Sequence, residues 1–278
     1  MEGKRLLMMS GFARKSVNAS VMLALMISLI GVVVLGDEKS GSWASELAPE
    51  LWIETFSDDF DGDRLDYDKW MPKDPWEVVR NEELQGYWIK AFHLEDGLLR
   101  IRAEDAASYY DGAKRDFRSG MMTTTRNFSQ RFGRFEIRCR VPAGDGLWPA
   151  FWMLPEPPSW PPEIDVLEIL GGEPHRLYMS HHWSDAAKGG KHKAQTGEFA
   201  GPDFSESFHV FTVVWRRDEI RWYVDGVLRH QSDEEVPQIP MFLLVNLAIG
   251  GWAGPPSKET SFPADFEVDY VRVWRERE

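Results

Sequence analysis

Residues 133–141 read Gly-Arg-Phe-Glu-Ile-Arg-Cys-Arg-Val, so apolar and charged side chains alternate along this segment. The apolar positions, beginning with Phe135, fall on one face, and Glu136, Arg138 and Arg140 fall on the other. A period of two residues is typical of a β-strand with one face in the core and the other in solvent. The segment therefore predicts a half-buried strand.

The sequence on either side of this segment carries the same signals. Apolar runs flank Asp96-Gly97 and Asp225-Gly226, and the Asp-Gly dipeptide supplies the positive φ angles of a tight hairpin turn. Further β-branched and aromatic runs lie at 211–215, 241–247 and 268–274. No stretch of ten residues after position 36 has helical periodicity. We therefore expect an all-β chain with many strands, as in a sandwich or jelly roll.

Composition narrows the classes of function. The chain has 278 residues, with 32 Lys and Arg against 45 Asp and Glu, for a formal net charge of −13. An acidic chain without a basic patch does not favour nucleic acid as a partner. The single cysteine, Cys139, excludes an intramolecular disulfide and a thiolate zinc site. An acidic domain with 13 Trp favours a neutral substrate or a solid matrix.

The first 36 residues resemble a signal peptide. Four basic residues, Lys4, Arg5, Arg14 and Lys15, precede an apolar run at 21–35, which is the order of an n-region and an h-region. This run is shorter than the roughly 20 residues of a spanning helix, so we expect export to the periplasm or the extracellular space. An uncleaved membrane anchor is the alternative. The predicted organisation is a leader at 1–36, a linker at 37–50 and one domain at 51–278.

The segment 163–168 reads Glu-Ile-Asp-Val-Leu-Glu and contains three acidic residues. In a regular strand, Glu163 and Asp165 share one face while Glu168 lies on the opposite face. An extra residue accommodated as a β-bulge at Val166-Leu167 would bring Glu168 onto the same face. We therefore expect a bulged strand with three carboxyls on one side.

Three carboxyls on one face suit glycoside hydrolysis. Close carboxyls raise each other's pKa, and this reaction needs one ionised and one protonated carboxyl. Asp165, the shorter side chain in the middle, is expected to hydrogen-bond one glutamate and to tune it. The alternative is an acidic edge strand that deters aggregation, and spacing alone does not separate the two interpretations.

Together with five other segments, the hexapeptide resembles glycoside hydrolase family 16. Those segments are Asn-Glu-Glu-Leu-Gln at 81–85 with Tyr87, Phe-Gly-Arg-Phe-Glu-Ile-Arg at 132–138, Gly-Leu-Trp-Pro-Ala-Phe-Trp-Met-Leu at 146–154, Asn-Leu-Ala-Ile-Gly-Gly-Trp at 246–252 and Val-Asp-Tyr-Val-Arg-Val at 268–273. The resemblance covers nearly all of residues 51–278. The inserted residue resembles the bulged branch of the family, which includes laminarinases, agarases and carrageenases.

The resemblance implies a β-jelly-roll sandwich of two antiparallel sheets with a concave cleft, and endo-acting hydrolysis of a β-linked polysaccharide with retention of configuration. It makes Glu163 the nucleophile, Glu168 the acid/base and Asp165 the assisting carboxylate. The implied substrate-binding residues are the aromatic Trp148, Trp152, Trp160 and Trp252, and the polar Asn81, Glu82, Gln85, His182 and Asn246.

No cofactor is expected for catalysis. By resemblance, Glu54, Gly97 and Asp269 are candidates for a structural calcium site. We expect a monomer that acts on an uncharged β-1,3- or mixed-linkage β-glucan, without stable membrane contact once the leader is cleaved. An agarase- or carrageenase-like galactan hydrolase is the alternative substrate class, and a β-glucan-binding protein without catalysis is the alternative of a different kind.

Overall fold

The computed structural model describes residues 46–185 and 188–278. The predicted leader at 1–36 and most of the predicted linker at 37–50 lie outside these residues. Within the described part of the chain, no helix is both long and apolar enough to cross a membrane.

The described residues form strands joined by turns, with two short 3₁₀ helices, η1 (Pro49–Leu51) and η3 (Gly251–Ala253). The strands are β1 (Trp52–Asp58), β2 (Gln85–Tyr87), β3 (Phe92–Glu95), β4 (Leu98–Ala103), β5 (Ser108–Tyr110), β6 (Ala113–Arg115), β7 (Phe117–Ser119), β8 (Met121–Thr123), β9 (Gly133–Arg140), β10 (Leu147–Pro155), β11 (Glu163–Ile169), β12 (Arg176–Asp185), β13 (Lys191–Ala200), β14 (His209–Trp215), β15 (Ile220–Val224), β16 (Val227–Ser232), β17 (Met241–Ile249) and β18 (Ala264–Glu276).

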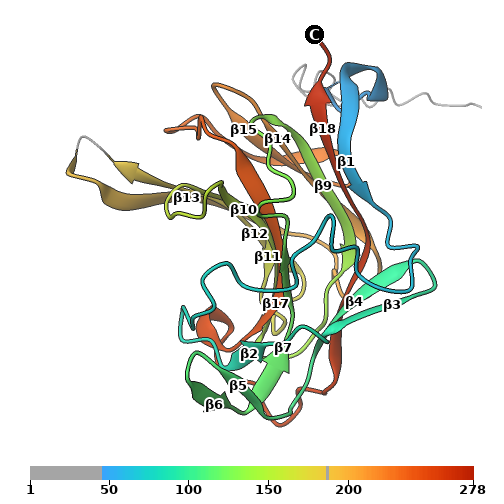
Figure 1. Cartoon of the computed structure of the whole chain (residues 1–278). Coiled ribbons are helices and arrows are strands. Elements are labelled where there is room, and N and C mark those ends of the chain that lie inside the picture. The colour runs from blue at the N-terminus through green and yellow to red at the C-terminus, as the bar shows by residue number, and fades with distance from the viewer. Residues whose placement is uncertain (1–45, 186–187) are drawn as a thin grey trace, which may run out of the picture. The chain divides into compact units, whose positions relative to one another are not determined.

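Two antiparallel sheets make up the sandwich. The eight-stranded sheet has the order β16-β15-β14-β9-β18-β4-β3, with β1 also paired to β18, and the six-stranded sheet has the order β13-β12-β11-β10-β17-β8. Figure 1 shows β9, β14 and β18 in one layer and β10, β11 and β17 in the other. One core cluster contains buried residues of both sheets, such as Ile137 of β9 and Phe151 of β10. The predicted jelly-roll sandwich is therefore confirmed.

The local predictions from turns and periodicity hold. Asp96 and Gly97 connect β3 to β4, and Asp225 and Gly226 connect β15 to β16, each with φ between 49° and 76°. In the strand first identified from its alternation, the apolar side chains are buried against the opposite sheet. The charged positions of this strand face the other way, where they form ion pairs with acidic neighbours.

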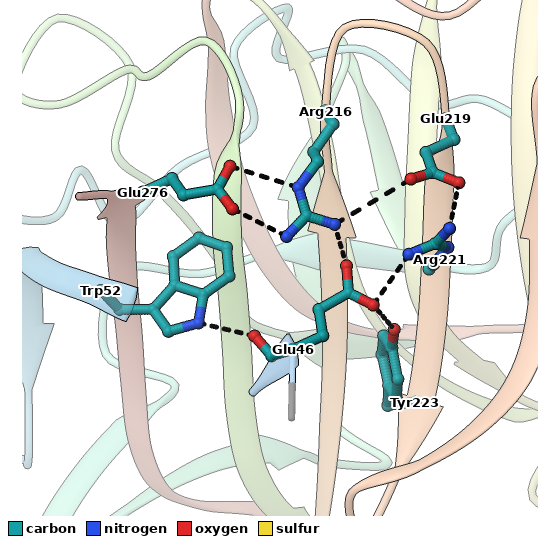
Figure 2. Close-up of polar contacts among 7 residues, drawn as sticks. All are labelled: Glu46, Trp52, Arg216, Glu219, Arg221, Tyr223 and Glu276. Atoms are coloured by element: carbon teal, nitrogen blue, oxygen red, sulfur yellow. Dashed lines mark hydrogen bonds and ion pairs between the residues drawn. The ribbon is translucent and has the colours of Figure 1, made fainter. Parts of the chain in front are cut away.

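The ordered contacts begin before residue 51. The side chain of Glu46, which is 6% exposed, contacts Arg216, Arg221 and Tyr223 beside β14 and β15, as Figure 2 shows. Trp52 of β1 donates its indole N–H to the backbone oxygen of Glu46 at 2.9 Å. The last residues of the predicted linker thus pack on the outer face of the eight-stranded sheet.

Candidate active site

A cleft of about 1130 Å³ lies over the face of the six-stranded sheet that points away from the core. Strands β10, β11, β12 and β17 form its floor, and residues 76–83 and 251–252 lie at its sides. All three acidic residues of the hexapeptide, Glu163, Asp165 and Glu168, line this cleft.

A β-bulge in β11 puts the three carboxyls on one wall. The register between β11 and β12 shifts between Asp165 and Glu168, and both Val166 and Leu167 are buried in the core. The backbone oxygen of Asp165 accepts a hydrogen bond of 2.8 Å from the indole of Trp222, which belongs to the opposite sheet. The bulge predicted from the sequence is therefore confirmed, and a buried donor satisfies the carbonyl beside it.

Burial and mutual repulsion set the protonation of these carboxyls. Burial raises the pKa of Glu163 well above its usual value, and the charge of Asp165 raises it further. The pKa of Asp165 is also raised well above its usual value, by burial and by the charge of Glu168. Burial raises the pKa of Glu168 to about 7, although His182 and Trp148 act in the opposite direction. The three carboxyls are therefore not all ionised at the same time at neutral pH.

Side chains of the neighbouring strands β10 and β12 touch the carboxyls directly. Trp148 of β10 donates its indole N–H to Glu168 Oε1 at 3.1 Å. His182 of β12 lies opposite Glu163, with its Nε2 at 3.6 Å from Glu163 Oε1 and at 3.1 Å from Asp165 Oδ2. On its other side, His182 Nδ1 is 2.9 Å from Nε2 of His192 in β13. The sequence carries no local signal for this role of His192, because the contact is made across two strands.

The four predicted tryptophans all line the cleft: Trp148, Trp152, Trp160 and Trp252. Trp160 and Trp252 are about half exposed, and indole faces open to solvent are suited to stacking on the apolar C–H faces of a pyranose. Trp252 packs edge-on against Trp148, with ring centroids 5.8 Å apart. The cleft is thus bordered by aromatic rings on both sides of the carboxyls.

A polar network under the cleft holds one of these rings. Trp152 donates its indole N–H to Asn246 Oδ1 at 2.7 Å, and Asn246 Nδ2 donates to Tyr87 OH at 3.3 Å. Tyr87 OH in turn donates to Glu83 Oε2 at 3.0 Å. Asn246 lines the cleft as predicted, but it is only 5% exposed and also positions Trp152.

The predicted cluster at 81–85 is divided between the cleft and the interior. Asn81 and Glu82 line the cleft, whereas Gln85 is 1% exposed and accepts the backbone N–H of Ile249. Gln85 therefore supports the floor, and the prediction that it contacts sugar is wrong. Glu83, which the sequence reading passed over, faces the cleft with a pKa raised by burial. The alternation of strand residues could not identify Glu83 as a cleft residue, because Glu83 lies before strand β2.

The predicted calcium ligands are not brought together. The register of β1 and β18 places Glu54 opposite Trp274, five residues from Asp269, or about 16 Å along a strand. Asp269 forms an ion pair with Arg138. Glu54 thus does not converge with Asp269 on one cation, whereas the pairing of Val268 with Leu99 brings Asp269 near Gly97 at the start of β4. The three residues as a set therefore do not fit the calcium site that the resemblance implied.

Comparisons with known proteins agree with this geometry. The sequence model described as "Glycosyl hydrolases family 16" matches residues 90–272. An endo-1,3-1,4-beta-glycanase, EglC, of Rhizobium meliloti is 35% identical over 243 residues, which cover 80% of this chain and 51% of that protein. A beta-glucanase of Rhodothermus marinus is 35% identical over 271 residues, covering 87% of this chain and 92% of that protein.

A solved structure gives the same result. The laminarinase catalytic domain of Thermotoga maritima superposes with a TM-score of 0.71 at 32% identity, covering 82% of this chain and 99% of that domain. This chain spans about half the length of the Rhizobium relative.

Proposed function

The chain belongs to glycosyl hydrolase family 16, and from that premise we propose that it is a retaining endo-hydrolase of β-1,3- or mixed-linkage β-glucan. The observation that carries the proposal is the bulged strand β11, which aligns Glu163, Asp165 and Glu168 on the wall of an aromatic cleft. The related beta-glucanase and laminarinase support the substrate class.

In the first step, the coupled carboxyls are in the protonation state in which Glu163 is ionised and Glu168 is protonated. Glu168 donates its proton to the glycosidic oxygen while the carboxylate of Glu163 attacks the anomeric carbon. The bond from that carbon to the glycosidic oxygen breaks, an ester to Glu163 forms, and the cleaved chain leaves as an alcohol. In the second step, the carboxylate of Glu168 takes a proton from water, which attacks the same carbon and releases Glu163. Glu168 ends protonated, ready for the next cycle.

The pKa of Glu168 suits both of its roles. A group that gives a proton in one step and takes one in the next works best when its pKa is near the ambient pH, and burial raises that of Glu168 to about 7. Asp165, between the two glutamates, is the assisting carboxyl, since its charge acts on Glu163.

The charges of the cleft favour a neutral glucan over a sulfated galactan. Among the described residues that line the cleft, Arg80 is the only Lys or Arg. Its guanidinium is bound to the buried Asp74 at 2.9 Å. A sulfated chain would therefore meet acidic groups without a basic partner of its own. The predicted export of the chain and its predicted monomeric state stay predictions from the sequence.

The substrate is tested by incubating the purified full-length protein with laminarin, lichenan, agarose and κ-carrageenan and identifying the product ends. We expect oligosaccharides of mixed length from laminarin or lichenan. Products from agarose alone would mean that the substrate is a galactan and not a glucan, and the proposed mechanism would still apply. Release from none of the four would favour a binding protein without catalysis.

The nucleophile is tested separately with the variant Glu163→Ala. We expect this variant to lose turnover and to regain it with azide, giving a glycosyl azide of inverted configuration. Azide replaces the missing carboxylate in the small space it leaves. Turnover close to that of the unmodified protein, without azide, would contradict the assignment.

A further inference from the structure

Three potential metal ligands converge beside the nucleophile. His182 Nε2 lies 3.1 Å from Asp165 Oδ2 and 3.6 Å from Glu163 Oε1. One ligand atom from each of the three side chains falls within 4.8 Å of the others. All three come from the paired strands β11 and β12, which fix their relative positions.

An unsatisfied oxygen points to a missing partner at this place. Asp165 is 3% exposed, and its buried Oδ2 has no hydrogen-bond partner. The close approach of His182 does not supply one, since the contact lacks hydrogen-bond geometry although the atoms are 3.1 Å apart. A buried carboxylate oxygen without a donor is costly. A cation shared by the carboxylate and the imidazole nitrogen would satisfy both atoms.

We propose that Glu163, Asp165 and His182 form a binding site for one Zn²⁺ ion, which reversibly blocks the nucleophile. Zinc bonds of roughly 2.0–2.2 Å to nitrogen and oxygen place tetrahedral ligand atoms about 3.3 Å apart. The two distances from His182 lie on either side of this value. Since the three groups line the open cleft, water can take the fourth position.

The next shell of residues fits a metal-bound imidazole. A histidine that binds a metal through one nitrogen usually donates the other N–H to an acceptor, which fixes its tautomer. Nδ1 of His182 lies 2.9 Å from Nε2 of His192. The ring of His192 in turn packs against Trp160, with ring centroids 4.7 Å apart. His192 is therefore placed to accept the hydrogen bond and hold His182 toward the metal.

The donor set selects a transition metal. One imidazole and two carboxylates suit Zn²⁺, whereas Ca²⁺ and Mg²⁺ prefer six or more oxygen ligands. The only Lys or Arg among the described residues of the cleft, Arg80, is paired with Asp74. The blocking effect rests on the proposed function, because a carboxylate bound to zinc is not available to attack a sugar. The binding of zinc itself does not rest on the proposed function.

Titration calorimetry of the chelator-treated full-length protein with zinc chloride tests the site. We expect saturable binding of one ion, its loss in His182→Asn, and an affinity about 10–100-fold weaker in His192→Ala. His209→Ala is the matched control, since His209 is hydrogen-bonded to a single carboxylate, Asp225, at 2.8 Å. Its zinc affinity should equal that of the unmodified protein.

Calcium chloride should give no saturable heat over the same range, and zinc should inhibit hydrolysis at the concentrations at which it binds. Thermal melting shows whether His182→Asn alters the fold. If it does, Glu163→Gln serves as a second variant, which should also lose zinc binding. The proposal would be overturned if the unmodified protein showed no saturable zinc binding. It would also be overturned if His182→Asn and Glu163→Gln bound zinc with the same affinity as the unmodified protein. Binding of zinc by a protein inactive on all four polysaccharides would leave the metal site standing and reject the hydrolase.

Discussion

Two buried carboxyls in this sandwich have opposite surroundings. Burial alone would raise the pKa of Glu46, but a hydrogen bond from Tyr223 and the charges of Arg216 and Arg221 lower it below its usual value. Figure 2 shows these cationic and phenolic groups around the carboxylate. Asp165 is buried at least as deeply, and its pKa is raised by that burial and, in addition, by the charge of the neighbouring carboxyl of Glu168.

Burial therefore does not distinguish a structural carboxyl from a functional one, whereas the charge of its partners does. The cluster of Glu46, Arg216, Arg221 and Tyr223 neutralises its charge and fastens the N-terminal segment to the outer face of the sheet. The carboxyls of β11 face each other and a histidine, which costs stability but leaves protons available for transfer.

The largest expected difference between the two regions is in activity. Glu163→Gln should lower kcat on laminarin by more than about 10⁴-fold, because it removes the nucleophile. Glu46→Ala should leave kcat unchanged, since Glu46 belongs to the outer face of the other sheet. Steady-state assays of reducing sugar measure both. Equal losses in the two variants would remove the distinction.

Stability should respond in the opposite sense. Glu46→Ala should lower the free energy of unfolding by about 2–4 kcal/mol, because two arginines lose a buried partner. Glu168→Gln should raise it by about 1–2 kcal/mol at pH 8, because a carboxylate that is costly to ionise becomes a neutral amide. Urea unfolding followed by fluorescence gives both values. A destabilised Glu168→Gln would contradict the idea that its charge is uncompensated.

The pH dependence of stability should also have opposite signs. The lowered pKa of Glu46 means that its contribution is present above the unfolded pKa and is lost as the pH falls through the folded one. Glu168, with a folded pKa of about 7, contributes stability at low pH and loses it as the pH rises through that value. Unfolding curves over a pH series, with Glu46→Ala and Glu168→Gln as references, separate the two contributions. The difference in unfolding free energy between each variant and the unmodified protein is compared over the pH series. If the two differences changed with pH in the same direction, this assignment would be contradicted.

The smallest effect concerns the tuning of the acid. Activity should fall as the pH rises through about 7, because Glu168 must be protonated for the first step. Trp148→Phe removes a hydrogen bond that favours the ionised form, so this basic limb should move to higher pH. The pH profile of kcat/KM measures the shift independently of any weaker substrate binding. A limb that stays in place would show that the indole does not tune Glu168.

Period-2 alternation and Asp-Gly turns were sufficient to predict the fold class, because each depends on residues adjacent in the chain. The bulge in β11 was also predictable, since only one inserted residue brings Glu168 to the face of Glu163. Contacts across strands were not predictable from the sequence. The burial of Gln85, the position of His192 beside His182 and the separation of Glu54 from Asp269 all depend on register. The charges around Glu46 come from residues about 170 positions later in the chain.

The most direct test of the central claim is to label the protein with a mechanism-based reagent, an epoxyalkyl β-glycoside of a laminari-oligosaccharide, and to locate the label by mass spectrometry. A carboxyl prepared to attack an anomeric carbon should open the epoxide when a neighbouring acid protonates it. We predict one ester on Glu163, which forms far more slowly in Glu168→Gln. A label on another residue, in a protein that still hydrolyses glucan, would contradict the account.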